Sequence, residues 1–124
     1  MSASSSVLII EDEFLIAEYL QTVLEDEGIE VAGTAASAAS AREIFKERTP
    51  GAIICDVRLG QEDGIELVRG LCGGREIGVV FLSGLGDDET LARVRSLASA
   101  GFIQKPMTPD ALVRKVREAL AVSA

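Results

Sequence analysis

The sequence predicts an α/β fold in which strands and helices alternate five times, (βα)5, and form a doubly wound three-layer sandwich around one parallel sheet. Two observations lead to this prediction. Short apolar runs alternate with longer segments whose apolar residues fall on one helical face. Three of the short runs, at residues 7–10, 52–55 and 78–82, are apolar throughout, which is typical of parallel strands that helices cover on both sides.

Strands and helices follow one another in a regular order. The strands are expected at residues 7–10, 29–35, 52–55, 78–82 and 102–104. Residues that cap helices stand at the expected helix starts, namely Asp12 or Glu13, Ser37 or Ser40, Asp63, Asp87 or Asp88, and Thr108 before Pro109. The helices are expected to end at Gly28, Arg48, Leu71, near Ala100 and near Leu120. Together they predict one domain over residues 7–121, after a flexible tail of residues 1–6.

Composition and charge exclude several classes of protein. No apolar run is long enough to cross a membrane, and the start MSASSS lacks the features of a secretory signal, so we expect a cytoplasmic protein without membrane contact. The net charge of −8 argues against direct binding of nucleic acid. The chain has no histidine, and Cys55 and Cys72 form no CxxC pair, which argues against a zinc site and against histidine-dependent nucleophiles.

Chemically active side chains follow four of the five predicted strands. These residues, in chain order, are Glu11, Asp12, Asp56, Ser83 and Lys105. Because ligands of such folds bind beyond the carboxyl ends of the strands, we expect these side chains to meet in one shallow cleft. Each residue also has an ordinary explanation, such as a helix cap for the carboxylates or a solvated charge for the lysine. Their joint occurrence at four strand ends favours a site.

Three carboxylates in one cleft predict a bound cation. Without one they would repel each other, and one of them would take up a proton. Oxygen ligands in a small open site suit Mg²⁺. We expect Asp12 and Asp56 as direct ligands, Glu11 as a ligand directly or through water, and the backbone carbonyl of Arg58 as a further oxygen. Lys105 would balance the remaining charge.

Four motifs now identify a resemblance. The segments are VLIIEDE, CDVRLGQEDG, VVFLSG and GFIQKP. In type, spacing and order they resemble a two-component response-regulator receiver domain of the single-domain, chemotaxis-receiver kind, over about residues 7–120. The resemblance implies a flavodoxin-like sheet with strand order 2-1-3-4-5. It also implies a cis peptide bond between Lys105 and Pro106.

The resemblance implies a function for the strand-end residues. Asp56 would accept a phosphoryl group from a histidine kinase or a histidine phosphotransfer protein in a Mg²⁺-dependent reaction, with Lys105 and Ser83 binding the phosphoryl oxygens. Ser83 and Phe102 would then shift together and change the surface of the fourth helix, fifth strand and fifth helix, where an unidentified downstream protein binds. The chain would be a phosphoacceptor that assists its own phosphorylation and slow dephosphorylation, and not an enzyme with a separate substrate.

Some positions depart from the family pattern. Gly60 stands where the family often has proline, which predicts a more mobile loop. Leu85 cannot orient an attacking water, so slow hydrolysis of the phosphoaspartate is expected. Phe14 and Leu15, at the start of the first helix, are candidates for kinase docking. Arg93 and other basic residues on the last two helices are either solvated charges or partner contacts.

Other functions stay open at this point. A receiver-like module that binds partners without phosphorylation is one alternative. A haloacid-dehalogenase-type phosphatase is a weaker one, because Arg58 occupies the position of its second aspartate. A flavin-binding domain would need more aromatics than one Tyr, four Phe and no Trp. Because no output domain follows the predicted domain, we expect a single-domain signalling or phosphorelay protein, as a monomer or weak homodimer.

Overall fold

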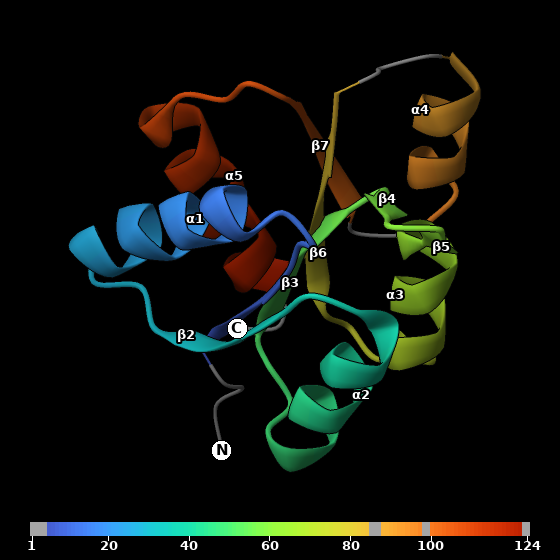
Figure 1. Ribbon diagram of the computed structural model, residues 1–124, viewed down its shortest axis with the longest axis horizontal. Helices are drawn as coiled ribbons and strands as arrows, with labels where there is room; N and C mark the ends of the chain where they lie inside the picture. Colours follow the sequence, from blue (N-terminus) through green and yellow to red (C-terminus); the bar gives the residue numbers. More distant parts are fainter. Residues whose placement is uncertain (1–4, 85–87, 98–99, 123–124) are drawn as a thin grey trace.

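The computed structural model describes residues 5–84, 88–97 and 100–122, which form a three-layer α/β sandwich (Figure 1). In this part of the chain, five parallel strands form one sheet in the order β2-β1-β3-β6-β7. They are β1 (Val7–Ile10), β2 (Val31–Ala35), β3 (Ala52–Asp56), β6 (Gly78–Ser83) and β7 (Ala100–Gln104). Since β6 and β7 are the fourth and fifth strands of this sheet along the chain, the predicted order 2-1-3-4-5 is confirmed.

Helices cover both faces of the sheet (Figure 1). Those in the described residues are α1 (Phe14–Asp26), α2 (Ala38–Glu47), α3 (Gly64–Cys72), α4 (Asp88–Arg95) and α5 (Pro109–Val122). Helices α1 and α5 pack on one face, and α2, α3 and α4 pack on the other. The chain therefore has the doubly wound (βα)5 architecture that its apolar pattern predicts.

Two apolar cores, one on each face, explain the continuously apolar strands. Successive residues of a strand point to opposite faces. In β1, Val7 and Ile9 belong to the core under α1 and α5, whereas Leu8 and Ile10 belong to the core under α2, α3 and α4. All four side chains are fully buried. A strand with helices on both sides has no position for a polar residue until it ends.

The register of the sheet places the strand ends at one edge. The last aligned pairs of neighbouring strands are Ile10 with Cys55, Asp56 with Leu82, and Ser83 with Gln104. The residues that follow β1 and β7 therefore leave the sheet close to Asp56 and Ser83. This edge carries the candidate site.

The end of α4 corrects one prediction. The sequence predicts a helix to about Ala100, but α4 ends at Arg95 and Ala100 begins β7. Ala100 and Gly101 align with Val79 and Val80 of β6. Pairing along the edge of a buried sheet outweighs the weak strand preference of alanine and glycine.

Two smaller differences concern short segments. Strand β2 begins at Val31 and not at Ile29, because the Ile29 amide donates to the Leu24 carbonyl and completes the end of α1. A two-stranded hairpin, β4 (Arg58–Leu59) with β5 (Glu62–Asp63), lies between β3 and α3 and is not predicted by the sequence. Gly60 lies in the turn of this hairpin with φ +64°. Proline, which the family often has at this position, cannot adopt a positive φ.

The helix starts follow the predicted capping residues. The Ser37 side chain accepts from the Ser40 amide at 3.2 Å, and the Thr108 hydroxyl accepts from the Ala111 amide at 3.2 Å. Asp63 accepts from two amides of α3. Glu13 occupies the cap position of α1, but its side chain makes no cap hydrogen bond. Asp87, the other candidate start of α4, lies outside the described residues.

The start of the described chain is packed against the sheet. Ser6, which the predicted tail includes, is buried, and its carbonyl accepts from the Gly51 amide at 2.8 Å.

No helix in the described part of the chain is long and apolar enough to cross a membrane.

Candidate functional site

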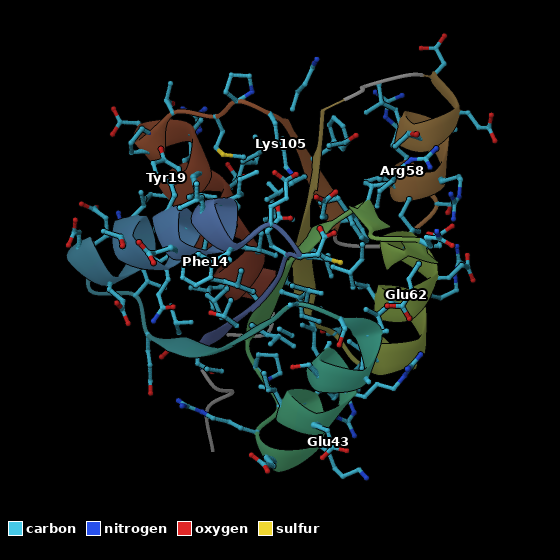
Figure 2. The ribbon with its side chains drawn as sticks, in the orientation of Figure 1. Phe14, Tyr19, Glu43, Arg58, Glu62 and Lys105 are labelled. Atoms are coloured by element: carbon cyan, nitrogen blue, oxygen red, sulfur yellow. The ribbon has the colours of Figure 1, made fainter. Side chains whose placement is uncertain are left out.

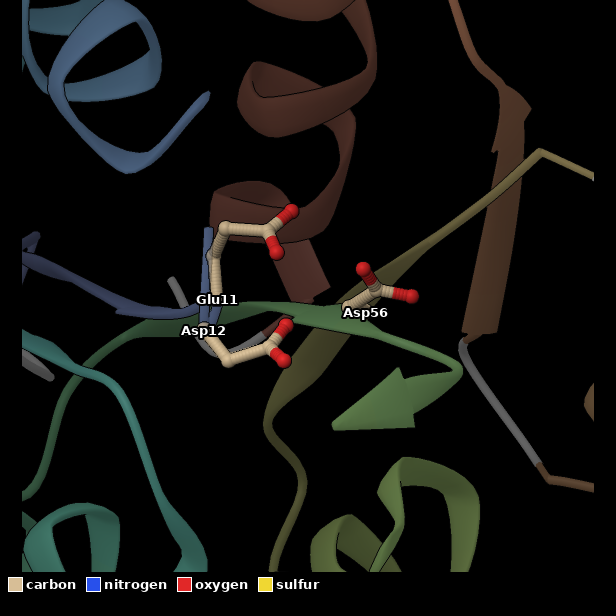
Figure 3. A group of neighbouring side chains, drawn as sticks. All are labelled: Glu11, Asp12 and Asp56. Carbon is tan, nitrogen blue, oxygen red and sulfur yellow. The ribbon is translucent and has the colours of Figure 1, made fainter. Parts of the chain in front are cut away.

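Three carboxylates converge at the carboxyl edge of the sheet (Figure 3). Glu11 and Asp12 follow β1, and Asp56 ends β3. One oxygen from each lies within 4.8 Å of the others. Glu11 and Asp56 are buried, whereas Asp12 is exposed. The structure thus brings together the three acidic side chains that the sequence singles out.

Lys105 bridges two of these carboxylates. Its Nζ donates to Oδ2 of Asp56 at 2.7 Å and to Oε1 of Glu11 at 3.0 Å. The Lys105 amide donates to the Ser83 carbonyl at 2.8 Å, which holds the lysine backbone beside the end of β6. The peptide bond between Lys105 and Pro106 is cis, as the resemblance implies. The lysine side chain is only 16% exposed, so water screens these contacts less than it would on an open surface.

Backbone contacts orient the Asp56 side chain. Its Oδ1 accepts from the Arg58 amide at 3.0 Å, which leaves Oδ2 for Lys105. The start of α3 packs on the Asp56 backbone so closely that a Cβ at Gly64 would collide with the Asp56 carbonyl oxygen. The Asp56 backbone at the end of β3 is therefore in close contact with the start of α3.

Glu11 has a second structural contact. Its Oε2 accepts from the Glu13 amide at 3.1 Å, at the start of α1. This bond goes to the amide of the residue before α1 and not to an amide of its first turn, so the helix-capping role left open for Glu11 is not what the structure shows. The two contacts use different oxygens and are compatible.

Burial and hydrogen bonds shift the pKa values of Glu11 and Lys105. Removal from water, with a smaller effect of the nearby Asp56 charge, raises the pKa of Glu11 to about 7 despite its hydrogen bonds. Burial acts to lower the pKa of Lys105, but its hydrogen bonds to Asp56 and Glu11 outweigh burial and raise it. The lysine therefore stays charged at neutral pH.

The cleft over Asp56 is open and has a volume of about 320 Å³. Its described lining residues are Asp12, Glu13, Asp56, Val57, Arg58, Gly60, Ser83, Gly84, Thr90 and Lys105. Figure 2 shows Lys105 between the side of the molecule that carries α1 and the side that carries Arg58. Thr90, on α4, was not singled out from the sequence, because nothing in its local sequence distinguishes it from other helix residues.

Phe102 and Leu85 are predicted functional residues that the described lining of the cleft does not contain. Phe102 is absent from the described cleft lining; it is half-buried and packs against the core under α2, α3 and α4. Leu85, the residue expected to slow hydrolysis, lies outside the described residues. The described lining of the cleft thus brings together Asp12, Asp56, Ser83 and Lys105. It does not include Phe102 or the buried Glu11, which contacts the site through Lys105.

The donor set fits a hard cation. All three clustered side chains offer carboxylate oxygens, and no histidine or thiol belongs to the group. Such oxygens in a water-accessible cleft suit Mg²⁺, which keeps part of its hydration shell. Arg58 lines the same cleft, where its carbonyl is the predicted further ligand.

Comparison with known proteins decides the family. The family profile described as the response regulator receiver domain matches residues 7–117. The chain belongs to this family. Receiver domains are parts of two-component signalling proteins; they interact with histidine kinases or phosphotransfer proteins and generally bind Mg²⁺ at an acidic pocket. Membership decides against the phosphatase and flavin interpretations and leaves the phosphorylation-independent receiver as the competing one.

Individual relatives agree with this assignment. The chain is 31% identical over 117 residues to the transcriptional regulatory protein PdtaR of Mycobacterium tuberculosis H37Rv, covering 94% of this chain and 56% of that protein. It is 38% identical over 104 residues to a protein-glutamate methylesterase/protein-glutamine glutaminase of Xanthomonas campestris, covering 81% of this chain and 29% of that protein. The chain therefore spans about half or less of these relatives.

A solved receiver domain shows the same fold. The receiver domain of NtrX from Brucella abortus is 33% identical and superposes with a TM-score of 0.85, covering 95% of this chain and 100% of that one. The resemblance drawn from the four sequence motifs is confirmed.

Proposed function

We propose that this receiver accepts a phosphoryl group on Asp56 from the phosphohistidine of a kinase or phosphotransfer protein, in a Mg²⁺-dependent reaction. The observation that carries the proposal is the placement of Asp56 in the open cleft, 2.7 Å from Lys105 and clustered with Glu11 and Asp12. Phosphoryl transfer needs positioning and neutralisation of charge, which a cation held by the acids and the Lys105 ammonium would supply.

The reaction forms one bond and breaks another. A carboxylate oxygen of Asp56 attacks phosphorus, the phosphorus–nitrogen bond of the phosphohistidine breaks, and the donor imidazole leaves with the electron pair and takes a proton. Little base catalysis is needed, so positioning and neutralisation of charge decide the rate. Mg²⁺, held by Asp12, Asp56, the Arg58 carbonyl and Glu11 directly or through water, would supply that neutralisation.

Lys105 and Ser83 would receive the phosphoryl oxygens. Lys105 already contacts Asp56, so its ammonium is in place for an oxygen of the incoming group. Ser83 ends β6 and lines the same cleft, and its hydroxyl would be a second donor to the phosphoryl group. A shift of Ser83 toward the phosphoryl group, with Phe102 moving in the core behind it, would change the surface of α4, β7 and α5 for a downstream protein.

The partner would dock beside the cleft. Phe14 and Leu15 begin α1 and are 73% and 77% exposed. Glu13, immediately before them, lines the cleft. An apolar contact of this kind would hold a phosphohistidine over Asp56.

We also propose that the reaction takes place in the cytoplasm. The proposed donor is a kinase or phosphotransfer protein, and both cysteines are unpaired.

The phosphoaspartate would persist rather than hydrolyse within seconds. This part of the proposal rests on the apolar Leu85 of the sequence, which cannot hold an attacking water. A dephosphorylation half-life of seconds in the presence of Mg²⁺ would contradict it.

The test uses a small phosphodonor. Wild type, Asp56→Asn and the matched control Asp110→Asn, an exposed aspartate of α5, are incubated with Mg²⁺ and acetyl phosphate, and intact masses are recorded. We expect one added phosphoryl group in wild type and the control, none in Asp56→Asn, and none with excess chelator. Addition to all three proteins would exclude Asp56 as the site. No addition to wild type, even from a phosphorylated histidine protein, would favour the phosphorylation-independent receiver.

A further inference from the structure

The hairpin between β3 and α3 touches three helices. Strands β4 and β5 align Arg58 with Asp63 and Leu59 with Glu62. Leu59 is buried and anchors the hairpin in the core. The two acids of β5 then reach different partners: Glu62 accepts from the Ala38 amide at the start of α2 at 3.1 Å, and Asp63 contacts both α3 and α4.

Asp63 uses its two oxygens for two helices. Oδ1 accepts from the amides of Ile65 and Glu66 at 3.0 and 3.2 Å and caps α3. Oδ2 accepts from the Arg93 guanidinium of α4 at 2.6 Å. Partial burial acts to raise the pKa of Asp63, but Arg93 and the α3 amides outweigh burial and lower it. The carboxylate therefore stays charged and keeps both contacts at neutral pH.

Helix α4 has few other strong attachments. Among its described residues only Val94 is buried. Arg93 adds a contact with Glu66 at 3.7 Å. One turn earlier on the helix, Thr90 lines both the Asp56 cleft and the adjoining cleft that Arg93 and Asp63 share. Residues three apart lie on one helical face. This face of α4 is therefore turned toward residues 56–63, here called the phosphoacceptor loop.

Direct contacts continue from Asp63 to Asp56. Gly64, next to Asp63, donates its amide to the Val57 carbonyl at 2.8 Å. Arg58, paired with Asp63 across the hairpin, donates its amide to Oδ1 of Asp56. A displacement of Asp63 would therefore move the backbone on which the Asp56 carboxylate rests.

We propose that Arg93 is a positioning residue for the phosphoacceptor loop: through Asp63 it fastens α4 to the segment that orients Asp56. This inference rests on the proposed function, since it concerns the readiness of Asp56 to be phosphorylated. Coupling between two sites is reciprocal. If the position of α4 affects the loop that orients Asp56, a change of that loop on phosphorylation would also change the position of α4. The Arg93–Asp63 pair would thus connect the reaction to the surface of α4.

The test is a double-mutant cycle. Its members are wild type, Arg93→Gln, Asp63→Asn and the double variant; asparagine keeps the cap of α3 but loses the charge. Arg93→Lys tests rescue, and Arg42→Gln, an exposed arginine of α2, is the matched charge control. Two quantities are measured: amide hydrogen exchange of Ile65 and Glu66 without Mg²⁺, and the rate of phosphorylation by acetyl phosphate.

We expect the double variant to show no more change than Arg93→Gln alone, because both lose the Arg93–Asp63 contact. Asp63→Asn should show most of that change, since it keeps only the longer contact of Arg93 with Glu66 at 3.7 Å. For an exposed ion pair that change is about two- to fivefold, as faster amide exchange and slower phosphorylation. Arg93→Lys should recover part of it, and Arg42→Gln should match wild type. Wild-type values for Arg93→Gln, additive effects in the double variant, or an equal effect of Arg42→Gln would overturn the proposal.

Failure of the proposed function would look different. If wild type accepts no phosphoryl group, the phosphorylation rates report nothing about Asp56, and the proposed function fails. The exchange measurement on Mg²⁺-free protein still decides whether Arg93 holds the loop through Asp63.

Discussion

Helices α4 and α5 lie on opposite faces of the sheet beside β7, and they are held in different ways. Helix α5 buries Leu112, Val113, Val116 and Ala119, and it packs so closely on β6 that a Cβ at Gly78 would collide with the Ala119 backbone. Helix α4 buries only Val94 among its described residues and adds the exposed ion pair of Arg93 with Asp63. Apolar burial is the stronger attachment. Helix α5 is therefore firmly attached to the sheet, whereas α4 can move at a smaller cost in free energy.

The largest effect should come from removing an apolar contact of α5. Leu112 is fully buried, so Leu112→Ala should lower the free energy of unfolding by about 2–5 kcal/mol. Leu91 of α4 is only half-buried, and Leu91→Ala should cost about 1 kcal/mol or less. Urea denaturation measures both. Equal losses would mean that α4 is held as firmly as α5, and the comparison would be wrong.

The buried carboxyl group of Glu11 should have a smaller effect on the free energy of unfolding, and this effect should depend on pH. The pKa of Glu11 is about 7 in the folded protein, above its ordinary value of 4.5. Between these values the folded state binds more protons than the unfolded chain. Without Mg²⁺ the stability should therefore be highest below that window and fall by about 1–3 kcal/mol as the pH rises through it.

Two controls belong to this pH experiment. Glu11→Gln should flatten the profile, and added Mg²⁺ should restore stability at the alkaline side, because the cation favours the carboxylate. A wild-type profile that rises with pH across the window would contradict the burial of a protonated Glu11. Thermal unfolding in buffers of matched ionic strength measures wild type, Glu11→Gln and wild type with Mg²⁺. Leu112→Ala should lower the stability equally at every pH, so the slope of its profile should match that of wild type.

Next in size is the loss of the α3 cap. Asp63→Ala removes both the cap and the ion pair and should cost about 1 kcal/mol, whereas Asp63→Asn keeps the cap and should cost less. Ser37→Ala, which removes the cap of α2 far from α4, is the control. Denaturant midpoints rank the three variants. If Asp63→Asn cost as much as Asp63→Ala, charge rather than capping would be the main contribution of this residue.

The smallest effect should be the salt dependence of α4. Because Arg93 and Asp63 are partly exposed, about 0.5 M salt should weaken their pair and cost about 0.5 kcal/mol or less. The effect should appear as faster amide exchange in α4, with no change in the central turns of α5. Unchanged exchange in both helices would mean that the ion pair contributes nothing measurable to the position of α4.

The sequence predicts the frame and the cleft well, for physical reasons. Buried parallel strands must be apolar until they end, so Asp56 after Ile53, Ile54 and Cys55 marks a strand end. The same reasoning predicts that Glu11 and Lys105 belong to the site. Both follow predicted strands, and parallel strands of one sheet end at the same edge, wherever the helices pack. Their roles in phosphorylation stay predictions.

What the sequence does not predict depends on contacts between distant segments. Arg93 and Asp63 are 30 positions apart, and only the packing of α4 beside the hairpin brings them together. The hairpin strands have two residues each, too few for a periodic signal. The early end of α4 depends on pairing of Ala100 with β6, which local preferences of alanine do not reveal.

The buried thiol of Cys55 has a practical consequence. Its Sγ donates to the carbonyl oxygens of Asp56 and Gly64 at 3.2 and 3.8 Å, and burial raises its pKa. Cys55 is fully buried and contacts Gly64, so movement of the start of α3 away from the Asp56 backbone would expose it to a thiol reagent. Cys72 is half-exposed and gives an internal reference. The rate at which Cys55 is labelled, relative to Cys72, therefore reports how often the loop opens, without any added probe.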